Sequence, residues 1–168
     1  MLLETMSTAL SARPAETHAL EIARTVLADR GSSAAGFRAV CTTVGRGQAA
    51  FELAAEHPEA VVTAWFLDLF VRTAAVASWE SPPPGLVAAC DADMPPGPYD
   101  LAVLPFSKSG EAELTRDVLQ AAFMNLAIGG RLVAAIDNPR DNWLREQLAE
   151  TGETVRVRPA TSASGSSV

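Results

Sequence analysis

The sequence is short of the residues from which metal centres, disulfide frameworks and polyanion-binding surfaces are built. Its 168 residues include two cysteines and two histidines. Cys41 and Cys90 lie far apart in apolar stretches, so we expect neither a disulfide framework nor a spaced zinc site, and no metal. Acidic residues outnumber basic residues 20 to 13, which gives a net charge of −7. This charge argues against a broad basic face that could hold a nucleic acid unaided.

Long hydrophobic runs are also missing. The longest one, residues 60–67, is interrupted by Thr63 and is far shorter than the roughly 20 apolar residues that cross a membrane. The first ten residues carry Glu4, where a secretory signal would need basic residues before an apolar stretch. We therefore expect a soluble cytoplasmic protein without membrane contact.

The sequence does contain enough apolar residues for one hydrophobic core. Hydrophobic residues make up 48% of the chain, which suits a single globular domain. Apolar stripes at helical spacing predict helices over residues 14–29, 48–56, 69–79, 111–127 and 139–150, the last capped by Asp137 or Asn138. Short apolar runs predict buried strands over residues 37–41, 61–66, 86–89, 100–104 and 131–136, and an alternating pattern predicts a half-exposed strand over 154–158.

Strands and helices alternate along the chain, which is typical of parallel βαβ units. We therefore expect an α/β fold, a Rossmann-like doubly wound and mostly parallel sheet with helices on both faces. The domain should span residues 14–158, after an N-terminal extension (1–13) and before a polar C-terminal tail (159–168). Ligands of such sheets bind at the carboxyl ends of the strands, near the switch in strand order. Candidate site residues should therefore directly follow the strands.

Residues 42–47 follow the first strand and contain Gly45 and Gly47 just before a helix. Glycines let a backbone approach a ligand closely, and the amino terminus of the next helix offers unpaired amides to polar or anionic groups. The letters fit a G-x-G-x-x-A turn of the nucleotide-binding type. Two glycines suit a tight turn without any ligand equally well, so both interpretations stay open.

Carboxylates follow the second and third strands. Asp68 could accept hydrogen bonds from ribose hydroxyls. Capping of the next helix explains Asp68 more simply, because such a cap contributes about 1 kcal/mol without a ligand. Asp91 and Asp93 could hold an adenine amine or act as a carboxylate pair. The prolines and glycine nearby favour a solvated turn instead.

The segment 105–110 after the fourth strand combines an aromatic ring, two hydroxyls and the only lysine of the chain, Lys108. A planar ring could stack on Phe106. Equally, Phe106 could fill the core while Ser107 or Ser109 caps the next helix. Neither histidine belongs to a Ser/His/Asp or Cys/His set, so we expect no hydrolytic chemistry.

In order and spacing, these motifs resemble the class I S-adenosylmethionine-dependent methyltransferases. The likeness is greatest to the small methyltransferase domain of the ribosomal RNA guanine-N2 enzymes. It covers residues 14–158, with an ungapped match over 41–66. The resemblance implies a class I methyltransferase fold whose last strand is not evident here, S-adenosylmethionine as cofactor, and a guanine exocyclic amine as methyl acceptor.

The first family motif, D-x-G-x-G-x-G, places its last two glycines on Gly45 and Gly47. Its acid falls on Cys41 and its first glycine on Thr43. These matches imply that Thr43, Gly45 and Gly47 lie next to the cofactor, in a loop that lacks the family's acid.

The acid with which the family holds the cofactor ribose falls on Phe66. Asp68, two residues later, is the nearby substitute, and Asp91 is the corresponding candidate after the third strand. The resemblance therefore implies cofactor contacts from Asp68 and Asp91.

The fourth family motif, N-P-P-F followed by a glycine, is represented by Leu104, Pro105, Phe106 and Gly110. Its asparagine is missing and one residue is deleted. By this match Leu104, Pro105 and Phe106 line the acceptor side, as the catalytic positions of the family.

Three hypotheses follow. The leading one is an S-adenosylmethionine-dependent methyltransferase of the ribosomal RNA type, which would meet RNA through a partner protein because the chain is acidic. The alternative is a catalytically inactive binding or scaffolding module with the same fold, since the acids at Cys41 and Phe66 are lost. A third takes residues 45–50 with Asp68 as a nicotinamide-dinucleotide fingerprint, although no chain remains for a substrate domain.

Overall fold

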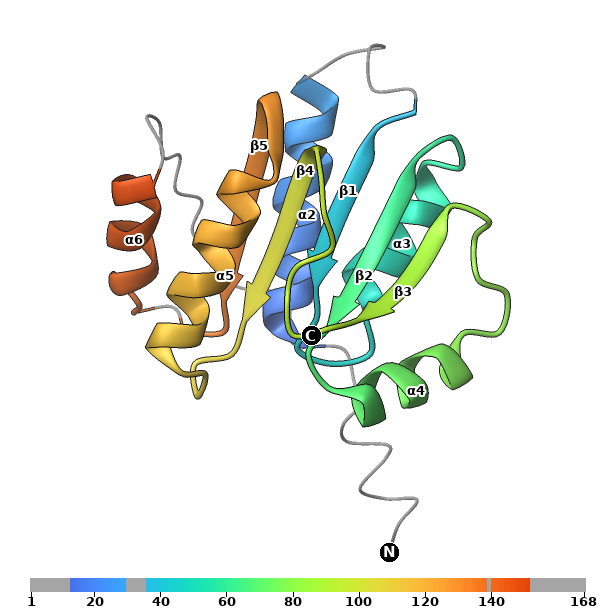
Figure 1. Cartoon of the computed structure of the whole chain (residues 1–168), viewed down its shortest axis with the longest axis horizontal. Coiled ribbons are helices and arrows are strands. Elements are labelled where there is room, and N and C mark those ends of the chain that lie inside the picture. The colour runs from blue at the N-terminus through green and yellow to red at the C-terminus, as the bar shows by residue number, and fades with distance from the viewer. Residues whose placement is uncertain (1–12, 30–35, 139, 152–168) are drawn as a thin grey trace, which may run out of the picture.

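The computed structural model describes residues 13–29, 36–138 and 140–151 and has an α/β architecture (Figure 1). Five parallel strands form one sheet in the order β3-β2-β1-β4-β5. The strands are β1 (Arg38–Thr42), β2 (Val61–Phe66), β3 (Leu86–Cys90), β4 (Tyr99–Phe106) and β5 (Leu126–Ile136). The helices are α2 (Pro14–Asp29), α3 (Gln48–Glu56), α4 (Leu69–Ser78), α5 (Ala112–Met124) and α6 (Trp143–Thr151).

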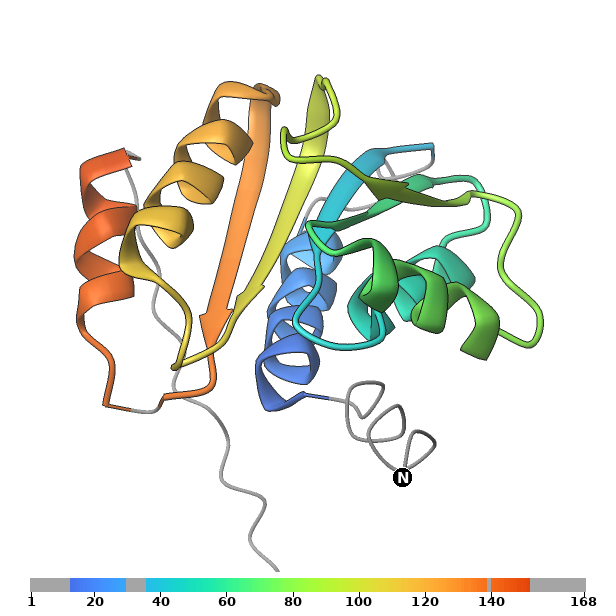
Figure 2. The same cartoon turned by 60° about the horizontal axis from the view of Figure 1, so that its bottom comes forward.

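Helices cover both faces of the sheet. α2 and α3 lie on one face and α5 and α6 on the other, whereas α4 lies beyond the arrowheads of β2 and β3 (Figures 1 and 2). Alternate residues of β1 face the two layers. Ala39 and Cys41 belong to the apolar cluster under α2 and α3, and Val40 belongs to the cluster under α5. Burial on both sides explains why this strand is a continuous apolar run.

The strand order reverses between β1 and β4. From β1 the chain crosses through α3 to β2, and from β4 it crosses through α5 to β5 on the other side. Such a reversal separates the two connections and leaves a crevice at the carboxyl ends of the strands. The predicted Rossmann-like, doubly wound parallel sheet is therefore confirmed.

The helices over residues 14–29 and 48–56 and the strand over 61–66 have the predicted bounds. α5, in contrast, ends at Met124 rather than at 127. Asn125 follows it, and its side-chain amide donates to the backbone oxygen of Ala121 at 2.9 Å. β5 then begins at Leu126, earlier than the predicted 131, because Leu126 pairs with Tyr99 across an irregular register.

α6 begins at Trp143, not at 139. Asp141 accepts a hydrogen bond from the backbone nitrogen of Leu144 at 2.8 Å, so the predicted cap at Asp137 or Asn138 is wrong. The predicted strand over 154–158, the tail 159–168 and residues 1–12 of the extension lie outside the described residues.

Within the described part of the chain, every helix is too short or too polar to cross a membrane.

Candidate functional site

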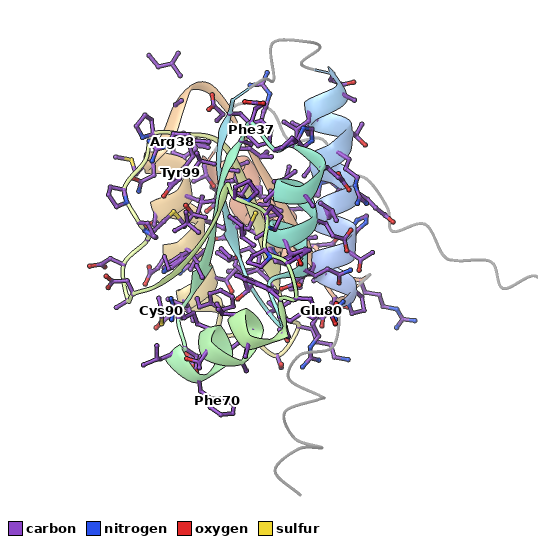
Figure 3. All side chains as sticks on the ribbon, turned by 90° about the vertical axis from the view of Figure 1, so that its right-hand side faces the viewer. Phe37, Arg38, Phe70, Glu80, Cys90 and Tyr99 are labelled. Carbon is purple, nitrogen blue, oxygen red and sulfur yellow. The ribbon has the colours of Figure 1, made fainter. Side chains whose placement is uncertain are left out.

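The segments singled out in the sequence all follow strands at one edge of the sheet. Figure 3 shows Cys90, the last residue of β3, toward this end of the molecule, with Phe70 of α4 pointing away from the sheet. Arg38 and Tyr99, the first residues of β1 and β4, lie at the opposite end. Because all five strands are parallel, the loops after β1, β2, β3, β4 and β5 meet at the carboxyl edge.

The loop between β1 and α3, residues 43–47, is the glycine loop. Gly47 ends it with φ +73° and ψ +31°, a left-handed conformation that favours glycine. A Cβ at Gly47 would lie 3.2 Å from Cζ of Phe66 and 3.3 Å from Cζ2 of Trp79. The same Cβ would lie 3.5 Å from the methyl group of Thr43. Both the backbone conformation and the crowding therefore favour glycine at this position.

Glu16, in the first turn of α2, reaches the glycine loop from outside it. Its side chain is fully buried. Oε1 accepts from the backbone nitrogen of Val44 at 3.1 Å, and Oε2 accepts from that of Gln48 at 3.0 Å. One carboxylate thus bonds both ends of the loop. Sequence reasoning missed this residue, although an acid on the buried stripe of a helix, one turn before Leu20, was a usable signal.

Two buried side chains next to the glycine loop, Glu16 and Cys41, have raised pKa values. Burial raises the pKa of Glu16 above its ordinary value, and the backbone amides of Val44 and Gln48 oppose that rise. Burial and the nearby Glu16 together raise the pKa of the Cys41 thiol. Cys41 therefore stays a neutral thiol, and a nucleophilic role for it has no support.

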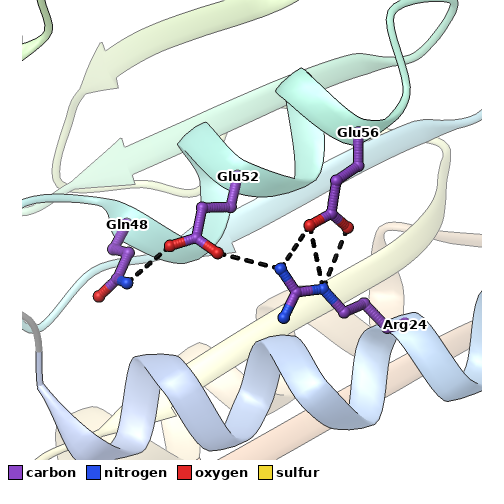
Figure 4. A network of polar contacts seen from close by, with 4 residues as sticks. All are labelled: Arg24, Gln48, Glu52 and Glu56. Atoms are coloured by element: carbon purple, nitrogen blue, oxygen red, sulfur yellow. Dashed lines mark hydrogen bonds and ion pairs between the residues drawn. The ribbon is translucent and has the colours of Figure 1, made fainter.

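An ion-pair network fixes α2 against α3. Arg24 of α2 pairs with Glu52 at 3.0 Å and with Glu56, and Glu52 also accepts from the side chain of Gln48 at 2.6 Å (Figure 4). These contacts join the helix that carries Glu16 to the helix that follows the loop.

At the end of β2, Asp68 could cap the next helix or bind a ribose. Phe66, at the family's acid position, is buried. Oδ1 of Asp68 accepts from the backbone nitrogens of Phe70 at 2.7 Å and Val71 at 3.0 Å. The capping interpretation of Asp68 is confirmed. A ribose contact from this exposed carboxylate stays a prediction.

Asp91 and Asp93 lie in an exposed turn after β3, as the nearby prolines and glycine indicated. The backbone nitrogen of Asp93 lies 3.5 Å from Oδ1 of Asp91. Trp65 donates its indole N–H to the backbone oxygen of Asp91 at 2.9 Å, which anchors this turn to β2. A cofactor contact from Asp91 stays a prediction.

Leu104, Pro105 and Phe106 are the last three residues of β4 and are buried. The backbone oxygen of Pro105 accepts from the Thr42 hydroxyl at 3.5 Å, and that of Phe106 accepts from the backbone nitrogen of Asp137 at 3.4 Å. Phe106 fills the core under α5 and α6. These residues therefore form the wall of the switch point rather than a free loop, and their role toward an acceptor stays a prediction.

Ser107 and Ser109 do not cap α5. Their hydroxyls bond each other at 2.9 Å, and Glu111, without a side-chain cap, precedes the helix. The predicted serine cap is wrong because the two side chains satisfy one another. The backbone nitrogen of Lys108 donates to the Asp137 carboxylate, which ties the loop after β4 to the end of β5.

A groove of about 430 Å³ lies between Arg46 of the glycine loop, the first residues of α3 and the end of α4. Phe51 and Trp79 form its aromatic wall, with ring centroids 6.0 Å apart. The indole N–H of Trp79 donates to the backbone oxygen of Arg46 at 3.2 Å. Among the described residues, no group of three His, Cys, Asp or Glu side chains could hold a metal ion.

Comparison with known proteins identifies the fold. No family model and no curated protein matches the sequence. A precorrin-8w decarboxylase from Methanobacterium thermoautotrophicum is similar in structure, with a TM-score of 0.54, 24% identity, and coverage of 70% of this chain and 63% of that one. A TehB-like S-adenosylmethionine-dependent methyltransferase from Corynebacterium glutamicum gives a TM-score of 0.51 at 18% identity, covering 90% and 77%.

A coclaurine N-methyltransferase bound to N-methylheliamine and S-adenosylhomocysteine gives a TM-score of 0.50 at 14% identity, covering 67% of this chain and 34% of that one. The match therefore spans less than two thirds of the decarboxylase and of the coclaurine enzyme. The chain has the α/β, Rossmann-like fold of the class I methyltransferases.

Proposed function

We propose that this protein binds S-adenosylmethionine at the carboxyl edge of its sheet and transfers the methyl group to an acceptor. One observation carries the proposal. The glycine loop follows β1, adjoins the strand-order switch and leads into α3, which is where folds of this kind bind adenosine-containing cofactors. The fold is shared with a methyltransferase structure, and the loop supplies the site.

The residues at this edge fit such a cofactor. S-adenosylmethionine carries positive charge at its sulfonium and ammonium groups, and the exposed carboxylates of Asp68 and Asp91 lie at the ends of β2 and β3. Both cap bonds of Asp68 go to Oδ1, which leaves Oδ2 as a hydrogen-bond acceptor. Thr43, Gly45 and Gly47 would form the loop side of the site.

Methyl transfer makes few demands on ionisable residues. When bound, S-adenosylmethionine supplies an already activated methyl group, so positioning accounts for most of the acceleration. Leu104, Pro105 and Phe106 are buried at the end of β4 and would back the acceptor side as an apolar wall. Cys41, fully buried beneath the loop, contributes packing rather than nucleophilic chemistry.

The acceptor we propose first is a guanine exocyclic amine in ribosomal RNA, the class that the sequence resemblance implies. The net charge of −7 disfavours direct RNA binding, because affinity for nucleic acid comes largely from phosphate neutralisation. We therefore expect a basic partner protein to deliver the RNA. Methyl-transfer assays should include ribosomal RNA with and without ribosomal proteins, and a pool of small amines.

The deciding measurement is isothermal titration of S-adenosylmethionine and S-adenosylhomocysteine into the full chain. Gly45→Trp fills the loop, and Ala28→Trp places the same side chain on the exposed end of α2 as a control. Binding that survives in Ala28→Trp and disappears in folded Gly45→Trp supports the proposal. Absence of binding by the wild-type protein would overturn it.

A second candidate is a binding module without turnover. Two observations favour it. Phe66 is buried where the family has its ribose-binding acid, and three neighbouring apolar side chains at the start of α4 are exposed: Leu67 by 48%, Leu69 by 65% and Phe70 by 60%. Such a module would bind neither S-adenosylmethionine nor S-adenosylhomocysteine, so the same titration separates the candidates. NADH titrated in parallel tests the dinucleotide alternative.

A further inference from the structure

We infer that Glu16 is the positioning carboxylate of the glycine loop, supplied by α2 because β1 carries Cys41 instead of an acid. Its consequence for cofactor binding rests on the proposed function. The effect on the loop does not depend on that function and can be tested without any ligand.

The contacts are those of a clamp. Val44 lies near the start of the loop and Gln48 is the first residue of α3. Separate oxygens of one carboxylate accept from their backbone nitrogens at 3.1 and 3.0 Å. Because the two oxygens are held rigidly by one carbon, the carboxylate fixes the separation of the two amides. Residues 45–47 are thereby held in one shape between them.

The loop needs this clamp because it cannot cap α3 by itself. The first amides of a helix have no partner within the helix, and Gly47 has no side chain that could accept from them. A negative charge at this position is also favoured by the helix dipole. Glu16, on α2, therefore accepts the hydrogen bond that a capping side chain at position 47 would otherwise accept.

Apolar packing and ion pairs both hold the helix that carries Glu16 in position. Ala19 and Leu20 of α2 are buried in the same apolar cluster as Cys41. Arg24, two turns after Glu16, binds Glu52 and Glu56 of α3 (Figure 4). The apolar packing of Ala19 and Leu20, together with these ion pairs, positions α2 against α3 and so positions Glu16 at the loop.

Position 41 offers an internal control. Cys41 is fully buried, and it lies close enough to Glu16 for the carboxylate to raise the thiol pKa. An acid introduced there would repel Glu16 in the wild-type background. In a Glu16→Ala background the same acid would meet loop amides that have lost their acceptor.

The first test measures the loop itself. Glu16→Gln keeps the size of the side chain, but its NH₂ group faces an amide donor. We expect exchange protection of the Val44 and Gln48 amides to fall about tenfold or more, the usual effect of losing a charged hydrogen bond. Core amides in β4 should change little. A packing role alone would leave the loop amides as protected as in the wild type, and that result would overturn the inference.

The second test is the exchange of the acid between positions. We expect Cys41→Asp to lower loop protection in the wild-type background and to restore it at least threefold in Glu16→Ala. Equal loss in both backgrounds would overturn the inference. If the double variant does not fold, Glu16→Gln decides alone, since that substitution conserves volume.

Cofactor affinity is the third measurement. We expect Glu16→Gln to weaken S-adenosylmethionine binding about tenfold, with partial recovery in the exchanged double variant. Failure of the wild-type protein to bind would refute the proposed function while the exchange data still decide the role of Glu16. Wild-type binding that Glu16→Gln leaves unchanged would refute the link between the clamp and the cofactor.

Discussion

The indole N–H of Trp79 donates to the backbone oxygen of Arg46 at 3.2 Å, so the end of α4 is bonded to the glycine loop. Cζ2 of the same ring lies 3.3 Å from the position of a Cβ on Gly47. α4 lies beyond the ends of β2 and β3 rather than along the sheet (Figures 1 and 2). Its carboxyl end is nevertheless part of the loop's environment.

Trp79→Phe should separate this hydrogen bond from the ring. We expect the free energy of unfolding to fall by about 0.5 kcal/mol, because one solvent-exposed N–H···O bond is lost while most apolar contact remains. Urea denaturation followed by circular dichroism measures it. Trp143→Phe is the control, since it makes the same change in α6, which packs on the opposite face of the sheet from α3. We expect only Trp79→Phe to weaken cofactor binding, and an equal effect of both would contradict this.

Gly47→Ala should be more harmful than Gly129→Ala. Both glycines have a positive φ, +73° and +77°, so alanine at either position costs about 1 kcal/mol in backbone strain. A Cβ at Gly129 would meet nothing within 4 Å, whereas at Gly47 it would crowd Phe66 and Trp79. We expect the extra loss at Gly47 to be about 1 kcal/mol or more. Equal melting temperatures of the two variants would show that the rings move aside.

The sheet could be predicted from the sequence because its signals are local. Val61–Phe66 is apolar except for Thr63 and is bounded by a His-Pro turn and Asp68, so its type and bounds follow from its β-branched and aromatic residues. The start of β5 was not predictable in this way. Leu126 joins the sheet through its register with Tyr99, a distant pairing that residues 126–130 do not encode.

The candidate site was predictable in place but not in its contacts. Gly45 and Gly47 marked the loop, since they stand between an apolar strand and a helix. The role of Glu16 depends on how α2 crosses the sheet, which no local pattern specifies. Sequence spacing left two interpretations of Asp68, a helix cap and a ribose contact. The structure establishes the cap, because Asp68 accepts hydrogen bonds from the backbone nitrogens of Phe70 and Val71.

Two substitutions of Asp68 separate its role as a helix cap from any contact with a ligand. Asp68→Asn keeps an oxygen that can accept from Phe70 and Val71, so stability should stay within about 0.5 kcal/mol, whereas Asp68→Ala should lose about 1 kcal/mol. If Asp68 also binds the ribose, Asp68→Asn should weaken S-adenosylmethionine binding several-fold without a change in melting temperature. Unchanged affinity in Asp68→Asn would leave Asp68 as a cap alone.

The buried carboxyl of Glu16 should make stability depend on pH in an unusual direction. Burial raises its pKa in the folded protein above the ordinary 4.5, so the folded state binds more protons than the unfolded state between the two values. The free energy of unfolding contributed by this group is therefore fully present below about pH 4.5 and is lost as the pH rises through the folded pKa.

The quantity to measure is a difference between two proteins, because the contribution of every group other than residue 16 then cancels. We expect the free energy of unfolding of the wild-type protein, minus that of Glu16→Gln, to be larger at pH 4.5 than at pH 7.5. Urea denaturation of both proteins at several pH values gives this difference directly. A difference that instead grows with pH would mean that the amides of Val44 and Gln48 outweigh burial and hold the pKa of Glu16 below its ordinary value.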